Sequence, residues 1–165
     1  MTTHDLVPAP AAEDIAELTA KAKTAPRRRS HLNLHSAFDE PVQRLLIAAE
    51  PETYVQPHRH PGKPWEMLVL IHGAMDVLVF SDDGRLEERV ALREDGQRIM
   101  QYQATRFHGS VVLEPGTVIL EIKQGPYDSA SAKETPTWAP AEDSPDGPAV
   151  RDRMIDLSIG EAVTP

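Results

Sequence analysis

The residues best suited to do chemistry are two closely spaced histidines, a glutamate that follows them and a distant third histidine. His58 and His60 are two residues apart, Glu66 comes after a turn rich in proline and glycine, and His108 lies much later. Side chains two apart on a β-strand lie on one face, about 7 Å apart at the backbone. Two such imidazoles can both bind one metal ion at about 2.0–2.1 Å. Glu66 can return to the same face at the start of the next strand, so this spacing predicts a metal site.

Such a site would leave coordination positions open. Three histidines and one carboxylate do not fill the shell of a divalent ion, which is typical of a catalytic site and not of a closed structural one. Iron, manganese, nickel and zinc all accept these donors, so we expect one divalent metal ion whose identity the ligands do not fix. The chain contains no cysteine, which excludes a thiolate zinc site, an iron–sulfur cluster and a cysteine nucleophile.

A second group of polar residues alternates with apolar ones near the start of the chain. Arg29, His31, Asn33 and His35 occupy every second position of the segment 29–36, so on a strand they share one face. Two interpretations remain open. The segment is either an edge strand with its polar face in water, or a strand whose polar face lines a cavity and binds substrate.

The segment 117–124 places two charged residues on one strand face. Glu121 and Lys123 alternate with apolar residues, so they face either water or the interior of a barrel. In the second case Glu121 is a candidate for proton transfer and Lys123 for substrate binding. Tyr102 and Tyr54 could also donate a proton, and Tyr102 is the first candidate of the two. For both, the commoner case is a buried tyrosine whose hydroxyl has a structural hydrogen-bond partner.

A run of three arginines stands out in an acidic protein. Arg27 to Arg29 would ordinarily form ion pairs or a solvated face. The functional alternative is that they lie at the mouth of the barrel and bind a phosphate or carboxylate, which arginine can grip with two hydrogen bonds.

The elements that must position these residues are mostly strands. Residues 11–24 have the apolar spacing of a helix that ends before Pro26. Short strands are expected after it, at 29–36, 42–48, 65–72, 74–81, 85–92, 97–103, 106–113 and 117–124. We therefore predict an all-β fold with an N-terminal arm and helix (1–30), a barrel (31–127) and a loose C-terminal wrapping segment and tail (128–165). Residues 150–158 could form a short helix or a strand.

Composition narrows the class of partner. Acidic residues outnumber basic ones 26 to 17 among 165 residues, giving a net charge of −9, so nucleic acid is not an expected partner. No apolar run approaches the roughly 18 residues of a membrane span, and residues 1–10 lack the pattern of a signal peptide. We expect a cytoplasmic protein that does not enter membranes.

The spacing of His58, His60, Glu66, Gly73 and His108 resembles the two-motif signature of the cupin superfamily. That resemblance implies a small jelly-roll β-barrel holding one metal through the three histidines and Glu66. Two departures are present. Five residues separate His60 from Glu66, where the usual pattern has three or four, and the segment before His108 lacks the usual Pro-x-Gly turn.

A closer resemblance, to the WbuC family of cupin-fold metalloproteins, covers about residues 20–142. It is carried by Arg27-Arg28-Arg29 with His31, Asn33 and His35, by Tyr54, by Pro57-His58-Arg59-His60 and Trp65-Glu66, by Leu120-Glu121-Ile122-Lys123 with Gly125-Pro126-Tyr127, and by Lys133 with Trp138-Ala139-Pro140. The resemblance implies a context in bacterial surface-polysaccharide and O-antigen sugar biosynthesis, and a sugar or nucleotide-sugar ligand.

Three functions fit these expectations. The first is an isomerase or epimerase in which the metal acts as a Lewis acid and Glu121 or Tyr102 transfers the proton. A variant is an iron-dependent dioxygenase acting on a small molecule. The alternative is a non-catalytic module that binds a metal and a sugar. A barrel of this size commonly pairs with a second copy, so a homodimer is expected.

Overall fold

The computed structural model describes residues 10–129 and 133–164. The expected arm over residues 1–10 thus lies, apart from Pro10, outside the described residues. Eight strands and two helices make up the described part, and the all-β class is confirmed. In chain order they are α1 (Ala12–Thr24), β1 (Arg29–Asn33), β2 (Val42–Ala49), β3 (Glu66–His72), β4 (Ala74–Phe80), β5 (Leu86–Arg93), β6 (Ile99–Tyr102), β7 (Phe107–Val112), β8 (Thr117–Gln124) and α2 (Gly147–Asp156).

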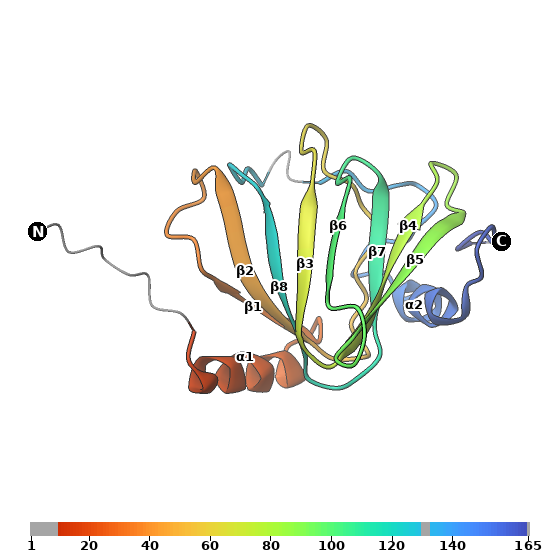
Figure 1. Cartoon of the computed structure of the whole chain (residues 1–165). Helices are drawn as coiled ribbons and strands as arrows, with labels where there is room; N and C mark the ends of the chain where they lie inside the picture. Colours follow the sequence, from red (N-terminus) through yellow and green to blue (C-terminus); the bar gives the residue numbers. More distant parts are fainter. Residues whose placement is uncertain (1–9, 130–132, 165) are drawn as a thin grey trace, which may run out of the picture.

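The strands form two antiparallel sheets that face each other. One sheet has the order β1-β2-β8-β3-β6 and the other β5-β4-β7. In Figure 1 the sheets spread apart at the end away from α1 and converge toward that helix. Each expected strand has a counterpart in these sheets.

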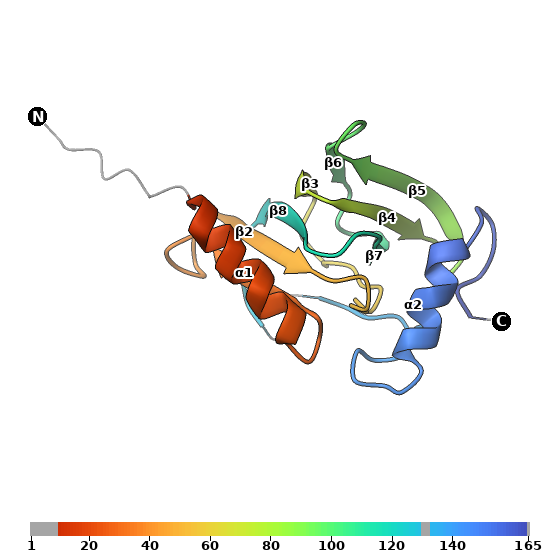
Figure 2. The ribbon, with the colours of Figure 1, turned by 90° about the horizontal axis from the view of Figure 1, so that it is seen from below.

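The two helices cover opposite outer faces of the barrel (Figure 2). Leu18 and Ala22 of α1 pack against Leu46 and Ala48 of β2, on the outside of the larger sheet. In the same way α2 packs on the smaller sheet, in a cluster that includes Val150, Met154, Leu78, Phe80, Phe107 and Val111. Residues 150–158, for which the sequence allowed either a helix or a strand, therefore lie mostly in a helix. None of the described helices combines the length and apolar character needed to cross a membrane.

β4 is buried along its whole length because both of its faces are covered. Leu78 and Phe80 point toward α2, whereas Met75 and Val77 pack between the sheets against residues of the larger sheet, namely Leu68, Leu70, Met100 and Ile119. This explains why its sequence is a nearly continuous apolar run and does not alternate.

The turn from β3 to β4 requires a glycine. Gly73 has a φ of +86°, a conformation that residues with a side chain rarely adopt. A Cβ at this position would lie 2.4 Å from Oγ1 of the buried Thr117. Gly73 thus lets the turn pack directly on β8, and so helps to fix where β3 carries Glu66.

Candidate metal centre and its cavity

Three imidazoles meet inside the barrel. His58, His60 and His108 offer ring nitrogens that all lie within 4.8 Å of one another. Two ligands of a single ion are at most about 4.4 Å apart when each bond is about 2.0–2.2 Å long, so small ring rotations would bring the three onto one ion. The backbones of His58 and His108 pair in a short antiparallel bridge. Each backbone N–H donates to the other residue's carbonyl oxygen, with N to O distances of 2.9 Å. This bridge joins the 57–60 segment to β7.

The tautomers of two of the histidines are set by the backbone. Nδ1 of His58 lies 2.9 Å from the carbonyl oxygen of Gln56, and Nδ1 of His108 lies 2.9 Å from that of Arg106. A carbonyl only accepts, so each Nδ1 carries the proton and each Nε2 presents a lone pair. Nε2 of His108 is buried and has no hydrogen-bond partner among the residues that the structure describes. A backbone carbonyl behind the ring is the usual arrangement behind metal-binding histidines.

Burial keeps the imidazoles of His58 and His108 neutral. The pKa of His108 is lowered to about 4, chiefly by burial. The pKa of His58 is also well below its usual value, because of burial and then the charge of His108. Neutral imidazole is the form that binds a metal, so these two rings are ready to do so at neutral pH.

Glu66 lies beside the cluster. Its Oε2 is 3.0 Å from Nε2 of His60 and 3.7 Å from Nε2 of His108, and the residue is buried. Burial alone would raise the pKa of Glu66. The nearby imidazole of His60 and the charge of Lys123 outweigh it and hold the pKa of Glu66 below its ordinary value. The carboxylate is thus ionised next to two of the three histidines, but it is not part of the group whose donor atoms all lie within 4.8 Å of one another.

The proton-transfer candidates Glu121 and Tyr102 lie against Glu66. Tyr102 and Lys123 are its cross-strand partners on β6 and β8, and Glu121 pairs with Leu68 two residues along β3. Burial, then the charge of Glu66, raises the pKa of Glu121 to about 7, although Lys123 opposes the shift. Burial and both carboxylates raise the pKa of Tyr102 well above its usual value. The charged face of the 117–124 segment therefore turns into the barrel and not into water.

These groups line one cavity of about 740 Å³. The polar face of β1 lines it too, which places Arg29, His31, Asn33 and His35 with the cavity and not on an outer face. His72, by contrast, is exposed and pairs with Glu94 outside this cavity.

Other candidates have structural partners. The Tyr54 hydroxyl donates to the carbonyl oxygen of Pro140 at 2.9 Å, as expected for a buried tyrosine. Arg28 pairs with Glu52, while Arg27 and Arg29 both pair with Glu142. The arginine run thus forms ion pairs, and two of its members also line the cavity.

Three residues of the cavity wall were not predicted from the sequence. Glu142 follows the Trp138-Ala139-Pro140 segment, and nothing in its local pattern marked it as facing the cavity. Phe38 and Tyr127 form a ring pair with centroids 5.3 Å apart, and both are exposed and line the cavity. Their signal was two aromatic residues in turns next to strand ends, in a chain with few aromatics.

Sequence comparison gives one family match. A family model described as a domain of unknown function (DUF6016) matches residues 11–92, slightly less than half of the chain. None of the curated proteins matches the sequence.

Comparison with solved structures gives the fold. Protein SO0799 from Shewanella oneidensis is 13% identical with a TM-score of 0.58, over 77% of this chain and 85% of its own. The capsular polysaccharide assembling protein CapF from Staphylococcus aureus is 12% identical with a TM-score of 0.57, over 68% of this chain. Oxalate decarboxylase from Bacillus subtilis is 16% identical with a TM-score of 0.50, over 65% of this chain. This chain spans 30% of CapF and 27% of the decarboxylase. The chain has the cupin-type jelly-roll fold, with an N-terminal helix on the larger sheet and a C-terminal segment wrapped on the smaller one.

Proposed function

We propose that this protein is a mononuclear metal-binding cupin that acts on a small, sugar-derived molecule. The observation that carries the proposal is the convergence of His58, His60 and His108, in which two rings present Nε2 because carbonyls hold their Nδ1 protons. The buried Nε2 of His108 lacks a hydrogen-bond partner among the described residues, which fits a donor that a metal completes.

In this proposal the three histidines hold the ion and Glu66 is the fourth ligand. The donor set of neutral imidazoles and one ionised carboxylate suits iron, manganese, nickel or zinc. When bound, the metal would supply Lewis-acid polarisation of a carbonyl or hydroxyl group.

Glu121 is our candidate for the proton-transfer residue. A carboxyl group whose pKa is about 7 can both take up and release a proton near neutral pH. Tyr102 keeps its hydroxyl proton and can donate a hydrogen bond to a substrate oxygen, while Lys123 stabilises the carboxylate form of Glu121. A base beside the histidine cluster favours an enzyme over a pure binding module. The reaction class that uses these parts is isomerisation or epimerisation through a proton next to a carbonyl.

The sugar-derived ligand is inferred from two sources. The polar face of β1 and Lys123 line the cavity with hydrogen-bond donors and acceptors suited to hydroxyl groups. The resemblance to the WbuC family, and the description of CapF as a capsular polysaccharide assembling protein, point to the same class of molecule.

The reaction is tested by proton exchange. Metal-loaded protein is incubated with a panel of nucleotide-sugars in D₂O, after thermal-shift screening selects those that bind. The proposal predicts metal-dependent deuterium incorporation at one sugar carbon, lost in Glu121→Gln while metal content stays unchanged. Oxygen consumption by the iron-loaded protein, with no deuterium incorporation, would instead support the dioxygenase alternative. Ligand binding without deuterium incorporation or oxygen consumption would instead support the non-catalytic binding module.

A further inference from the structure

One part of the cavity wall holds three cations around a single carboxylate. Arg27 and Arg29 both contact Oε2 of Glu142, the Arg27 contact being 3.4 Å, and Nζ of Lys133 lies 3.6 Å from Oε1. All four residues line the cavity. Positive charge therefore exceeds negative charge at this place, in a chain whose net charge is −9.

Arg29 is held in position without Glu142. One of its terminal nitrogens donates to the backbone oxygen of Tyr54 at 2.9 Å and to Oγ1 of Thr53 at 3.2 Å, and the Thr53 hydroxyl in turn donates to the carbonyl oxygen of Arg27 at 2.8 Å. The side chain is only 8% exposed. Because the scaffold fixes one nitrogen, the other stays aimed at an acidic group. A guanidinium fixed in this way is preorganised for a carboxylate or phosphate.

Glu142 does not form hydrogen bonds to all three of these cations. Its Oε1 is buried and accepts no hydrogen bond from the described residues, and Lys133 lies just beyond hydrogen-bond distance. A buried oxygen without a hydrogen-bond donor lowers the stability of the fold. Such an oxygen is therefore unusual in an ion pair that serves only to stabilise the fold. A ligand oxyanion free to adjust its position could contact both arginines and Lys133.

We propose that Arg29, Arg27 and Lys133 bind the carboxylate or phosphate group of the cavity's ligand, and that Glu142 takes the place of this group when no ligand is bound. The inference rests on the proposed function, since it assumes a small-molecule ligand, and adds that the ligand is anionic. Arg29 pairs with Ala49 of β2, whereas Glu66 is in register, through Lys123, with Gln43 at the other end of β2. Because Glu66 lies beside the histidine cluster, the anion site is offset from that cluster along the sheet. The ligand spans this offset.

Inorganic phosphate is the first probe, titrated by calorimetry into the full chain. Glu142→Gln removes the internal competitor and is expected to tighten phosphate binding about tenfold, or ~1.4 kcal/mol. Lys133→Gln, at a partly exposed side chain, is expected to weaken it several-fold without loss of stability. Arg28→Gln is the matched control, because Arg28 pairs with Glu52 and does not line the cavity. Its phosphate affinity should equal that of the wild type.

Parallel titrations separate this site from the metal site. His58→Ala should lose the metal yet keep its phosphate affinity; loss of phosphate binding there would place the phosphate on the metal and overturn the anion site, while leaving the metal proposal intact. Unchanged affinity in both Glu142→Gln and Lys133→Gln, or a wild type that binds no phosphate, would also overturn it. Glucose 1-phosphate and glucuronate, compared with neutral glucose, then show which oxyanion is preferred; equal binding of all three would contradict the proposal.

Discussion

Nζ of Lys123 lies 2.5 Å from Oε1 of Glu121, and the two side chains, 22% and 12% exposed, share the inner face of β8. Lys123 is also the cross-strand partner of Glu66. One lysine thus faces two carboxylates in the barrel. Its pKa is raised by the two carboxylates although burial works in the opposite direction, so it is charged at neutral pH.

Replacing Lys123 tests this arrangement. Lys123→Met would leave two buried carboxylates without their cation, so we expect a loss of about 3 kcal/mol in the free energy of unfolding, measured by urea denaturation at pH 7. Glu121→Gln added to this variant should restore part of the loss, because it removes one of the like charges. A loss below about 0.5 kcal/mol would mean that solvent already stabilises the carboxylates.

A second buried ion cluster fixes α2. Asp76 of β4 accepts from Arg89 and Arg93, both at 2.7 Å, and Arg89 also donates to the carbonyl oxygens of Met154 and Leu157 at the end of α2. Asp76→Asn leaves two guanidinium groups with a neutral partner. We expect it to lower the free energy of unfolding by about 3 kcal/mol.

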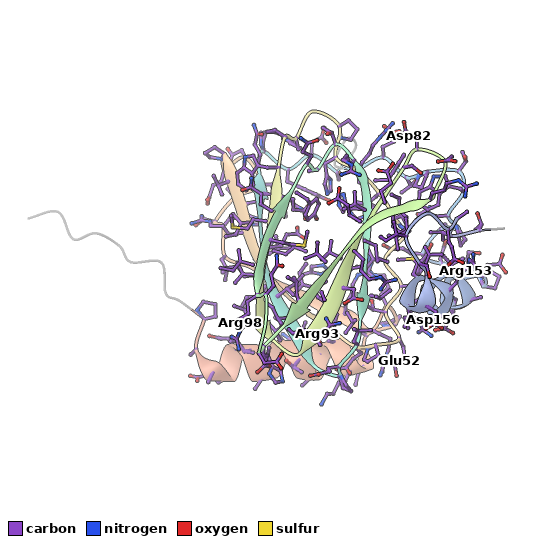
Figure 3. All side chains as sticks on the ribbon, turned by 45° about the vertical axis from the view of Figure 1, so that its right-hand side comes forward. Glu52, Asp82, Arg93, Arg98, Arg153 and Asp156 are labelled. Carbon is purple, nitrogen blue, oxygen red and sulfur yellow. The ribbon has the colours of Figure 1, made fainter. Side chains whose placement is uncertain are left out.

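The matched control is an aspartate on the surface. Asp156 is exposed at the end of α2. Figure 3 labels it together with Arg93, which belongs to the Asp76 cluster. Asp156→Asn should change the free energy of unfolding by less than about 0.5 kcal/mol. Equal effects of the two substitutions would contradict the role given to Asp76.

His31 makes the stability of the fold sensitive to acid. Burial, then the charges of Arg29 and Arg27, lowers its pKa from 6.5 to about 4. The unfolded chain takes up a proton near pH 6.5 and the folded chain only near pH 4, so stability is lost as pH falls through this range. The His31 side chain is exposed to the cavity, so we expect only a modest effect. Wild type should lose more stability than His31→Asn between pH 6.5 and 4, as measured by urea denaturation; equal losses would contradict the shift.

The sequence predicted most of the fold because strand and helix periods are local properties. The alternation in 117–124 placed Glu121 and Lys123 on one face, but could not say whether that face met water or the interior. That choice depends on how the two sheets pack, which is a long-range property. The two-residue spacing of His58 and His60 likewise predicted that they share a face. Their proximity to His108 could not be predicted locally, because it follows from a bridge between distant segments.

Glu142 illustrates the limit of local reasoning. Its partner Arg29 lies 113 residues earlier, and the segment between Tyr127 and α2 has no regular period to orient it. Only the path of the C-terminal segment across the cavity brings the two together. The arginine run alone therefore indicated a phosphate or carboxylate ligand, but not the internal carboxylate that it contacts.

The metal content of the purified protein, measured by elemental analysis beside three variants, tests the proposed metal centre directly. We predict close to one divalent ion per chain in the wild type, close to none in His58→Ala and His108→Ala, and the wild-type value in His72→Ala, whose imidazole is exposed and pairs with Glu94. Full metal content in His58→Ala and His108→Ala would show that these imidazoles do not hold the ion.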